Sequence, residues 1–140
     1  GHSCLIWCPA PHHYQVVGTT RDDAVGESFD KVARLLGLPY PGGPSIQKAA
    51  EGGDRRAFDF PRGLAQKDSL DFSYSGLKTA VLYQIRGAGG RTEDLAASFQ
   101  EAAVDALILK SLRAIEALGA QRLVVAGGVA ANKRLRERLK

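Results

Sequence analysis

The segment YQVVGTTRDDAVGESFDKVARLLG, residues 14–37, decides the fold because its pattern changes from that of a strand to that of a helix. Residues 14–19 predict the strand. Asp22 or Asp23 can then cap a helix, and Gly37 can end it in the left-handed conformation that helix ends favour. The apolar residues between these ends recur at helical spacing: Val25, Phe29, Val32 and Leu36. A strand that leads into an amphipathic helix indicates a mixed α/β fold.

Further elements are predicted on both sides of this segment. On the N-terminal side, residues 2–8 predict another strand, joined to the first by the turn-rich residues 9–13. On the C-terminal side, Pro44 is placed to start a short helix that runs to Glu51. Residues 52–70 are polar and irregular, and they predict a long surface loop.

The second half of the chain predicts a helix–strand–glycine–helix unit. The longest helix is expected at residues 92–118, with Gly119 as its stop, and its run Leu107-Ile108-Leu109 indicates a central, buried position. The other expected elements are a helix capped by Ser73 or Ser75 and ending near Arg86, a strand at residues 122–126, and a last helix that follows Gly127-Gly128.

The composition is that of one globular domain, residues 1–140. The chain has 140 residues, of which 44% are hydrophobic and 24% charged, and these values exclude wholesale disorder. No apolar run approaches the roughly 18 residues of a membrane helix, and residues 4–8 are too short for a signal peptide. Two cysteines cannot build a disulfide framework, which favours a reducing compartment and hence the cytoplasm. The absence of methionine predicts a piece or processed form of a longer protein.

The net charge of +4 is concentrated in residues 133–140, KRLRERLK. A run this short usually forms a solvated helix face, and that is the favoured interpretation. A contribution to binding a polyanion such as RNA is the alternative, which the positive charge permits but does not require.

Three carboxylates form the first candidate site. Asp23, Glu27 and Asp30 share one face of the first predicted helix, opposite its apolar face. Asp30, with Glu27 beside it, could accept hydrogen bonds from ligand hydroxyls, as a carboxylate does from ribose in nucleotide sites. The alternative, which spacing alone favours, is that Asp23 faces the helix N-terminus while Asp30 pairs with Arg34.

Two glycine turns are the other candidates. Gly42-Gly43 would let a flat ligand approach the backbone, although a tight turn between prolines explains the pair on its own. In residues 126–132, AGGVAAN, a predicted strand runs through two glycines into a helix, which favours binding of an anion or nucleotide. Asn132 offers a donor and an acceptor there. Close packing of helix on strand is an equal alternative, and neither GxGxxG nor GxxxxGK[ST] is present.

Two catalytic groupings are disfavoured. Ser75 and Lys78 form an S-x-x-K pair, but the partner motifs S-D-N and K-T-G are absent, so a helix cap is the better interpretation of Ser75. Zinc ligands by residue type alone are His2, Cys4, Cys8, His12 and His13. On a strand, Cys4 and Cys8 would lie about 13 Å apart, far beyond the reach of one shared metal.

Three motifs, in this order and spacing, resemble the universal tRNA N6-adenosine threonylcarbamoyltransferase family: GTTRDDAVGESFDKVARLLGLPYPGGP, DFSYSGLKT and RLVVAGGVAANKRLR. This family is also called TsaD-like and was formerly described as O-sialoglycoprotein endopeptidases or glycoproteases. The resemblance implies an actin-like ATPase fold of the sugar kinase/Hsp70 type, of which residues 1–140 would form most of the second lobe. It implies substrate binding by Asp30, Gly43 and Asn132, and by Gly1 as the last glycine of an SGGHT-type loop.

The implied reaction transfers a threonylcarbamoyl group from threonylcarbamoyl-AMP to N6 of the adenosine next to a tRNA anticodon. ATP or AMP would be related ligands of the same site. The family holds a divalent metal, iron or zinc, through an HxxxH motif and a later aspartate in a DNG-type segment. Neither motif matches a stretch of this chain, so no metal ligand is expected in it, and alone it is expected to be inactive.

The implied partners are tRNA, a kinase-like paralogue and an ATPase subunit, with no membrane, and a homodimer is also possible. Two other functions stay open from the residues alone. One is a non-catalytic nucleotide-binding or assembly module. The other is a metallo-glycopeptidase, which would need a nucleophile such as Ser75 or a zinc-bound water.

Overall fold

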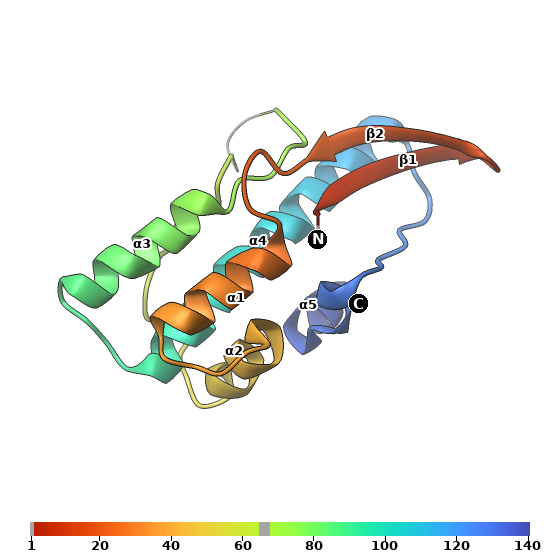
Figure 1. Ribbon diagram of the computed structural model, residues 1–140. Helices are drawn as coiled ribbons and strands as arrows, with labels where there is room; N and C mark the ends of the chain where they lie inside the picture. The colour runs from red at the N-terminus through yellow and green to blue at the C-terminus, as the bar shows by residue number, and fades with distance from the viewer. Residues whose placement is uncertain (1, 65–67) are drawn as a thin grey trace.

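The computed structural model describes residues 2–64 and 68–140, and its architecture is the mixed α/β one that the sequence predicts (Figure 1). Within these residues, no helix is both long and apolar enough to cross a membrane. A two-stranded sheet precedes the helices and one short 3-10 helix, η1. The bounds are β1 Cys4–Ala10, β2 His13–Thr19, α1 Val25–Leu35, α2 Gly42–Ala50, α3 Ser75–Arg86, α4 Thr92–Leu118, η1 Gly128–Ala131 and α5 Lys133–Arg138.

The two predicted strands are present as an antiparallel hairpin, although β1 lies two residues later in the chain than the predicted 2–8. Cys4 lies opposite Thr19, and Trp7 lies opposite Gln15; the register is irregular between Leu5 and Ile6 and again between Trp7 and Ala10. Most side chains of the hairpin are exposed, and Figure 1 shows its tip pointing away from the helices. The base of the hairpin is joined to the rest of the fold, because Thr20 forms a parallel bridge with Phe72.

Helix α4 lies in the middle of the helical layer, as its apolar pattern predicts (Figure 1). Phe99 of α4 meets Phe29 of α1 edge to face, with ring centroids 5.0 Å apart. Both rings belong to one core cluster that also takes side chains from α2 and α3. The helix ends at Gly119 in the left-handed conformation, with φ of 65°, so its predicted bounds are confirmed.

The described parts of the segment between α2 and α3, residues 51–64 and 68–74, are irregular, as predicted, but they are held against α4. The rings of Phe58 and Phe60 stack with centroids 5.7 Å apart, and Phe60 is buried. The fully buried Lys110 donates from Nζ to the carbonyl oxygen of Leu64, at 2.7 Å, and to that of Ser69. Burial lowers the pKa of the Lys110 ammonium, which these two carbonyls stabilise in place of water.

Asp22 joins two distant parts of the chain. Its Oδ1 accepts the backbone N–H groups of Tyr74 (2.8 Å) and Ser75 (3.1 Å). Its Oδ2 accepts the hydroxyls of Ser73 (2.6 Å) and Ser75 (3.0 Å). Asp22 therefore satisfies the free N–H groups at the start of α3. The prediction that Ser73 or Ser75 caps this helix is wrong, because both hydroxyls donate to Asp22 instead of accepting from the helix.

Helix α1 also begins differently from the prediction, which gave Asp22 or Asp23 as its cap. The N-cap residue is Ala24, whose N–H donates to the Glu27 carboxylate at 3.3 Å. The next N–H, of Val25, donates to Ser3 Oγ at 2.9 Å, so a residue from before β1 satisfies the start of this helix.

Two further predictions need correction. Residues 122–126 form no strand: the segment has no regular structure and is exposed, with 87% of Val124 accessible. A strand needs an edge with which to pair, and the sheet of β1 and β2 does not include residues 122–126. Helix α2 begins at Gly42, two residues before Pro44, because a side chain of α1 accepts the Gly42 N–H.

We predict that Asp22→Ala lowers the free energy of unfolding by about 2 kcal/mol, because two backbone N–H groups and two hydroxyls lose their acceptor. Urea unfolding followed by circular dichroism measures the change. Asp68→Ala, which removes an exposed carboxylate, is the matched control and is expected to stay within about 0.5 kcal/mol of the parent. Equal midpoints for the two variants would contradict the capping role.

Candidate functional site

Asp30 and the first turn of α2 form one unit. The half-buried Asp30, on α1, accepts the Gly42 N–H through Oδ1 at 2.8 Å. The backbones are so close here that a Cβ on Gly42 would lie 2.5 Å from the Cα of Asp30. Glycine is therefore required at position 42. Among the described residues, the second oxygen of Asp30, Oδ2, has no hydrogen-bond partner in the molecule, so it is available to a ligand.

Gly43 is open where Gly42 is closed. A Cβ added to Gly43 would have no atom within 4 Å, so the space beside this backbone is free. Gly43 follows directly on the residue that Asp30 holds, which places an open stretch of backbone next to the free carboxylate oxygen. A flat group could approach the chain at this position without displacing a side chain.

The acidic face of α1 is stabilised by a lysine that the sequence reasoning did not use. Lys31 Nζ lies 2.7 Å from Asp23 and 3.3 Å from Glu27, and the hydrogen bond that it donates to Asp23 is the main reason that the pKa of Lys31 is raised. The ion pair of Asp30 with Arg34, which spacing favoured, is not formed; the hydrogen bond that Asp30 makes is with the Gly42 N–H, through Oδ1. Asp23 and Glu27 thus have structural partners, while Asp30 keeps a free oxygen.

Asn132 is buried at the start of α5. Its Oδ1 accepts the Leu135 N–H at 2.9 Å, so Asn132 caps this helix. Its Nδ2 donates to Oε1 of Gln100, on α4, at 3.0 Å. The amide therefore has a structural role that the sequence did not indicate. A ligand could still use the second N–H of Nδ2 or the second lone pair of Oδ1.

The structure brings the three candidate segments together. Lys133, next to Asn132, donates its N–H to Oε1 of Gln47, on α2, at 2.8 Å. Val129, in η1, packs against the core cluster that holds α1. The preceding Gly127 has a φ of 99°, which favours glycine, and it turns the chain toward α1 and α2. Asp30, Gly43 and Asn132 thus lie on elements that touch one another, although they are far apart in sequence.

The remaining predicted residues are placed as follows. Gly1 lies outside the described residues. Ser75 donates its hydroxyl to Asp22, and within residues 2–64 and 68–140 it makes no hydrogen bond with Lys78, so the nucleophile–base pair is not assembled. Cys4 and Cys8 are free and exposed. No three His, Cys, Asp or Glu side chains of the described part of the chain are grouped to hold a metal ion.

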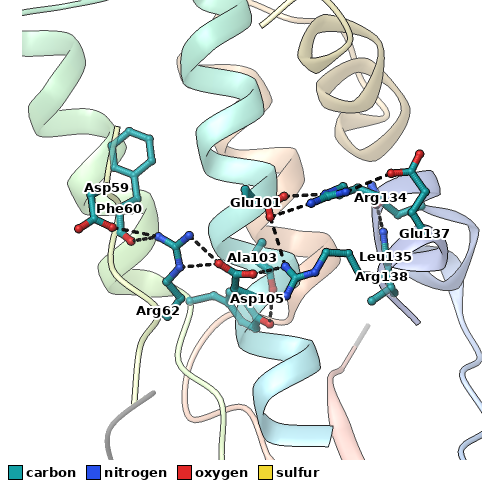
Figure 2. Close-up of polar contacts among 12 residues, drawn as sticks. Asp59, Phe60, Arg62, Glu101, Ala103, Asp105, Arg134, Leu135, Glu137 and Arg138 are labelled. Atoms are coloured by element: carbon teal, nitrogen blue, oxygen red, sulfur yellow. Dashed lines mark hydrogen bonds and ion pairs between the residues drawn. The ribbon is translucent and has the colours of Figure 1, made fainter. Parts of the chain in front are cut away.

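An ion-pair network links α4 to α5 and to the segment before α3 (Figure 2). Arg134 contacts both oxygens of Glu101, at 2.8 and 3.0 Å, and Arg62 Nη2 lies 2.6 Å from Asp105. Arg138 contacts both acidic residues. Burial alone would raise the pKa values of Glu101 and Asp105. Hydrogen bonds from these arginines outweigh burial, so both pKa values are lowered. Part of the predicted solvated face of residues 133–140 is therefore engaged inside the molecule.

The sequence contained a signal for this network that was not used. Glu101 and Asp105 are four residues apart on α4, and Arg134 and Arg138 are four residues apart on α5. Side chains at this spacing lie on one face of a helix, so the two pairs match when the helices pack together.

With its hairpin, central helix and glycine turns, the chain is a mixed α/β protein, and comparison with known proteins shows its family. The model of the family described as "TsaD: tRNA N6-adenosine threonylcarbamoyltransferase" matches residues 1–140. The chain belongs to the tRNA N6-adenosine threonylcarbamoyltransferase family. This confirms the resemblance carried by the three sequence motifs.

Curated relatives with this same name cover nearly the whole chain. The protein of Desulfitobacterium hafniense (strain Y51) is 56% identical over 99% of the chain. Those of Magnetococcus marinus and Thiobacillus denitrificans are 52% and 54% identical, again over 99% of the chain. The chain spans 42%, 41% and 41% of the lengths of these relatives, about two fifths. Each of these three relatives is named as a transferase.

We predict that Asn132→Ala lowers the free energy of unfolding by about 2 kcal/mol, because it removes the cap of α5 and leaves Gln100 Oε1 without a donor. Asn132→Ser keeps an oxygen that can cap the helix, so it is expected to lose less. Urea unfolding of both variants measures the difference. If serine is no better than alanine, the cap is not what stabilises this turn.

We also predict that stability falls as the pH drops below about 4.5. The pKa values of Asp22, Asp71, Glu101 and Asp105 are all lower in the folded protein than the ordinary 3.8 of Asp or 4.5 of Glu. The unfolded chain therefore binds more protons in this range, and the stabilisation is lost as pH falls through the ordinary and then the folded values. Thermal midpoints measured from pH 6 down to about 2 test this, and unchanged midpoints would contradict it.

Proposed function

We propose that the chain takes part in transferring a threonylcarbamoyl group from threonylcarbamoyl-AMP to N6 of the adenosine next to a tRNA anticodon. The family match over residues 1–140 carries this proposal. It is supported by the geometry, because the residues matching the family's substrate contacts lie on adjoining elements and Asp30 keeps an oxygen free.

In this proposal the chain supplies binding and orientation. Asp30 Oδ2 accepts hydrogen bonds from the ribose hydroxyls of the adenylate, as carboxylates do in other nucleotide sites. The open backbone at Gly43 receives the flat nucleoside. Asn132 orients the adenylate with the part of its amide that the helix cap does not use. Gly1 would contact the phosphate side.

The chemistry is acyl transfer without an enzyme nucleophile. The N6 amine attacks the carbamoyl carbon, the bond from that carbon to the AMP phosphate oxygen breaks, and the amine loses a proton. Because Asp30, Gly43 and Asn132 would hold the adenylate, the AMP leaving group stays oriented while the bond breaks. The engagement of Ser75 by Asp22 agrees with a direct transfer, because a covalent route would need that hydroxyl or another nucleophile activated.

The divalent metal of the family does not fit the residues that the structure describes. They hold no group of three His, Cys, Asp or Glu side chains that could bind it, so no step of the proposal uses a metal held by this chain. The chain would be most of the second lobe of an actin-like ATPase fold of the sugar kinase/Hsp70 type. Alone, it would bind nucleotide without turnover. Its partners would be tRNA, a kinase-like paralogue and an ATPase subunit in the cytoplasm.

We predict that AMP raises the thermal midpoint of the chain and that Gly43→Ala abolishes the rise. The added methyl group meets no protein atom, so the fold is kept, but it occupies the space in which the nucleoside is proposed to lie. At a hundred times Kd, a ligand that binds only the folded state stabilises it by about 2.7 kcal/mol, which is readily measured.

Gly76→Ala is the control for this experiment, since its methyl group is equally unobstructed but lies on α3. Asp30→Asn is a second variant, because it keeps an acceptor for the Gly42 N–H while removing the charge that the ribose hydroxyls would contact. A rise in midpoint that survives in Gly43→Ala as it does in Gly76→Ala would overturn the proposed nucleotide position.

A further inference from the structure

A basic pocket of about 330 Å³ lies between the segment that precedes α3 and the helices α4 and α5. It is separate from Asp30, Gly43 and Asn132, none of which lines it. Four arginines face it together with three acidic residues and one aromatic ring: Arg55, Arg56, Arg62, Arg134, Asp59, Glu101, Asp105 and Phe58.

The acidic residues at the base of this basic pocket are already neutralised. Glu101 forms ion pairs with Arg134 and Arg138, and Asp105 forms ion pairs with Arg62 and Arg138 (Figure 2). The same arginines have two further acidic partners, since the fully exposed Asp59 lies 3.4 Å from Arg62 and Glu137 lies 3.2 Å from Arg134. The charges at the base are therefore compensated within the molecule.

Arg55 and Arg56 line the basic pocket, but no carboxylate of the described residues pairs with their guanidinium groups. Within the described residues, neither guanidinium group forms a hydrogen bond or an ion pair. Their backbone is nevertheless fixed on α4. Asp54 N–H donates to Asp94 at 2.9 Å, and Ser98 Oγ donates to the Asp54 carbonyl at 3.1 Å.

Residues 54–58, which carry Arg55 and Arg56, are also held at their C-terminal end. Phe58 N–H donates to Ser98 Oγ at 3.1 Å. Gly53 packs so closely on α4 that a Cβ there would lie 1.9 Å from the carbonyl oxygen of Glu93. Two free guanidinium groups are therefore carried on an ordered backbone, which reduces the conformational entropy lost when they bind an anion.

We propose that this basic pocket binds phosphate groups, with Arg55 and Arg56 as the contacting residues and the backbone of an RNA as the source. Guanidinium groups match phosphate oxygens in a bidentate manner, and the two uncompensated positive charges of Arg55 and Arg56 attract an anion with more than one charge. The choice of RNA rests on the proposed function. The assignment of a phosphate site rests on the pocket alone.

The test compares Arg55→Gln/Arg56→Gln with the parent chain. The probes are a fluorescein-labelled single-stranded RNA, followed by fluorescence anisotropy, and inorganic tripolyphosphate, followed by calorimetry. We expect the double variant to bind RNA about tenfold more weakly at low salt. The slope of log K against log salt concentration should fall by about 1.4, because each lost contact with single-stranded RNA accounts for about 0.7.

Arg86→Gln/Arg122→Gln is the matched control, because it removes two exposed arginines that do not line the basic pocket. It is expected to change RNA affinity less than twofold. Unfolding midpoints of both variants should equal that of the parent, since Arg55 and Arg56 make no side-chain contact that holds the fold.

Each outcome decides the proposal. Weaker RNA binding in the pocket variant alone supports it with RNA as the source. Weaker tripolyphosphate binding with unchanged RNA binding supports the phosphate site but assigns it to a free phosphoanion. No difference between pocket variant and control overturns it. Gly43→Ala should leave RNA binding unchanged, so failure of the adenylate site and failure of this site give different results.

Discussion

The hydrogen bonds of the Asp22 carboxylate are the constraint on which the arrangement of the other elements depends. They join the end of the hairpin to the start of α3 across 52 residues of sequence. Asp71 reinforces the same junction, since it accepts the Thr19 N–H at 3.0 Å and pairs with Arg21 at 3.1 Å. Because α1 follows within three residues of Asp22, its position over α4 is set as well. Two of the three family motifs contact each other here, so part of their sequence has a structural role that does not depend on a ligand.

The sequence predicts correctly those helix ends that depend on residues close by in the chain. Helix α4 has its predicted bounds, because its stop at Gly119 depends on the backbone of that residue alone. The caps of α1 and α3 could not be predicted in this way, since the acceptors are Ser3 and Asp22, which lie far away along the chain. Residues 122–126 have the composition of a strand, but whether they form one depends on an edge with which to pair.

The candidate site shows the same division. Spacing places Asp30 on the polar face of α1, but the sequence does not show that Gly42 takes one of its oxygens and leaves the other free. Nor does it show that Asn132 is buried against Gln100, because that contact spans 32 residues. The resemblance to the family predicts a binding role for these positions, which periodicity alone does not. Much of the surface offered to a ligand is backbone at glycines, so its shape, more than its side-chain chemistry, would set what it accepts.

The burial of Lys110 has a consequence for the chemical reactivity of the protein. A lowered pKa makes an amine more nucleophilic near neutral pH, but its lone pair must also be reachable. In the folded state this ammonium is enclosed and directed at the carbonyl groups of Leu64 and Ser69. Amine-reactive labels therefore modify the exposed lysines first. Labelling of Lys110 is limited by how often the segment before α3 lifts from α4, which makes this residue a built-in reporter of that opening.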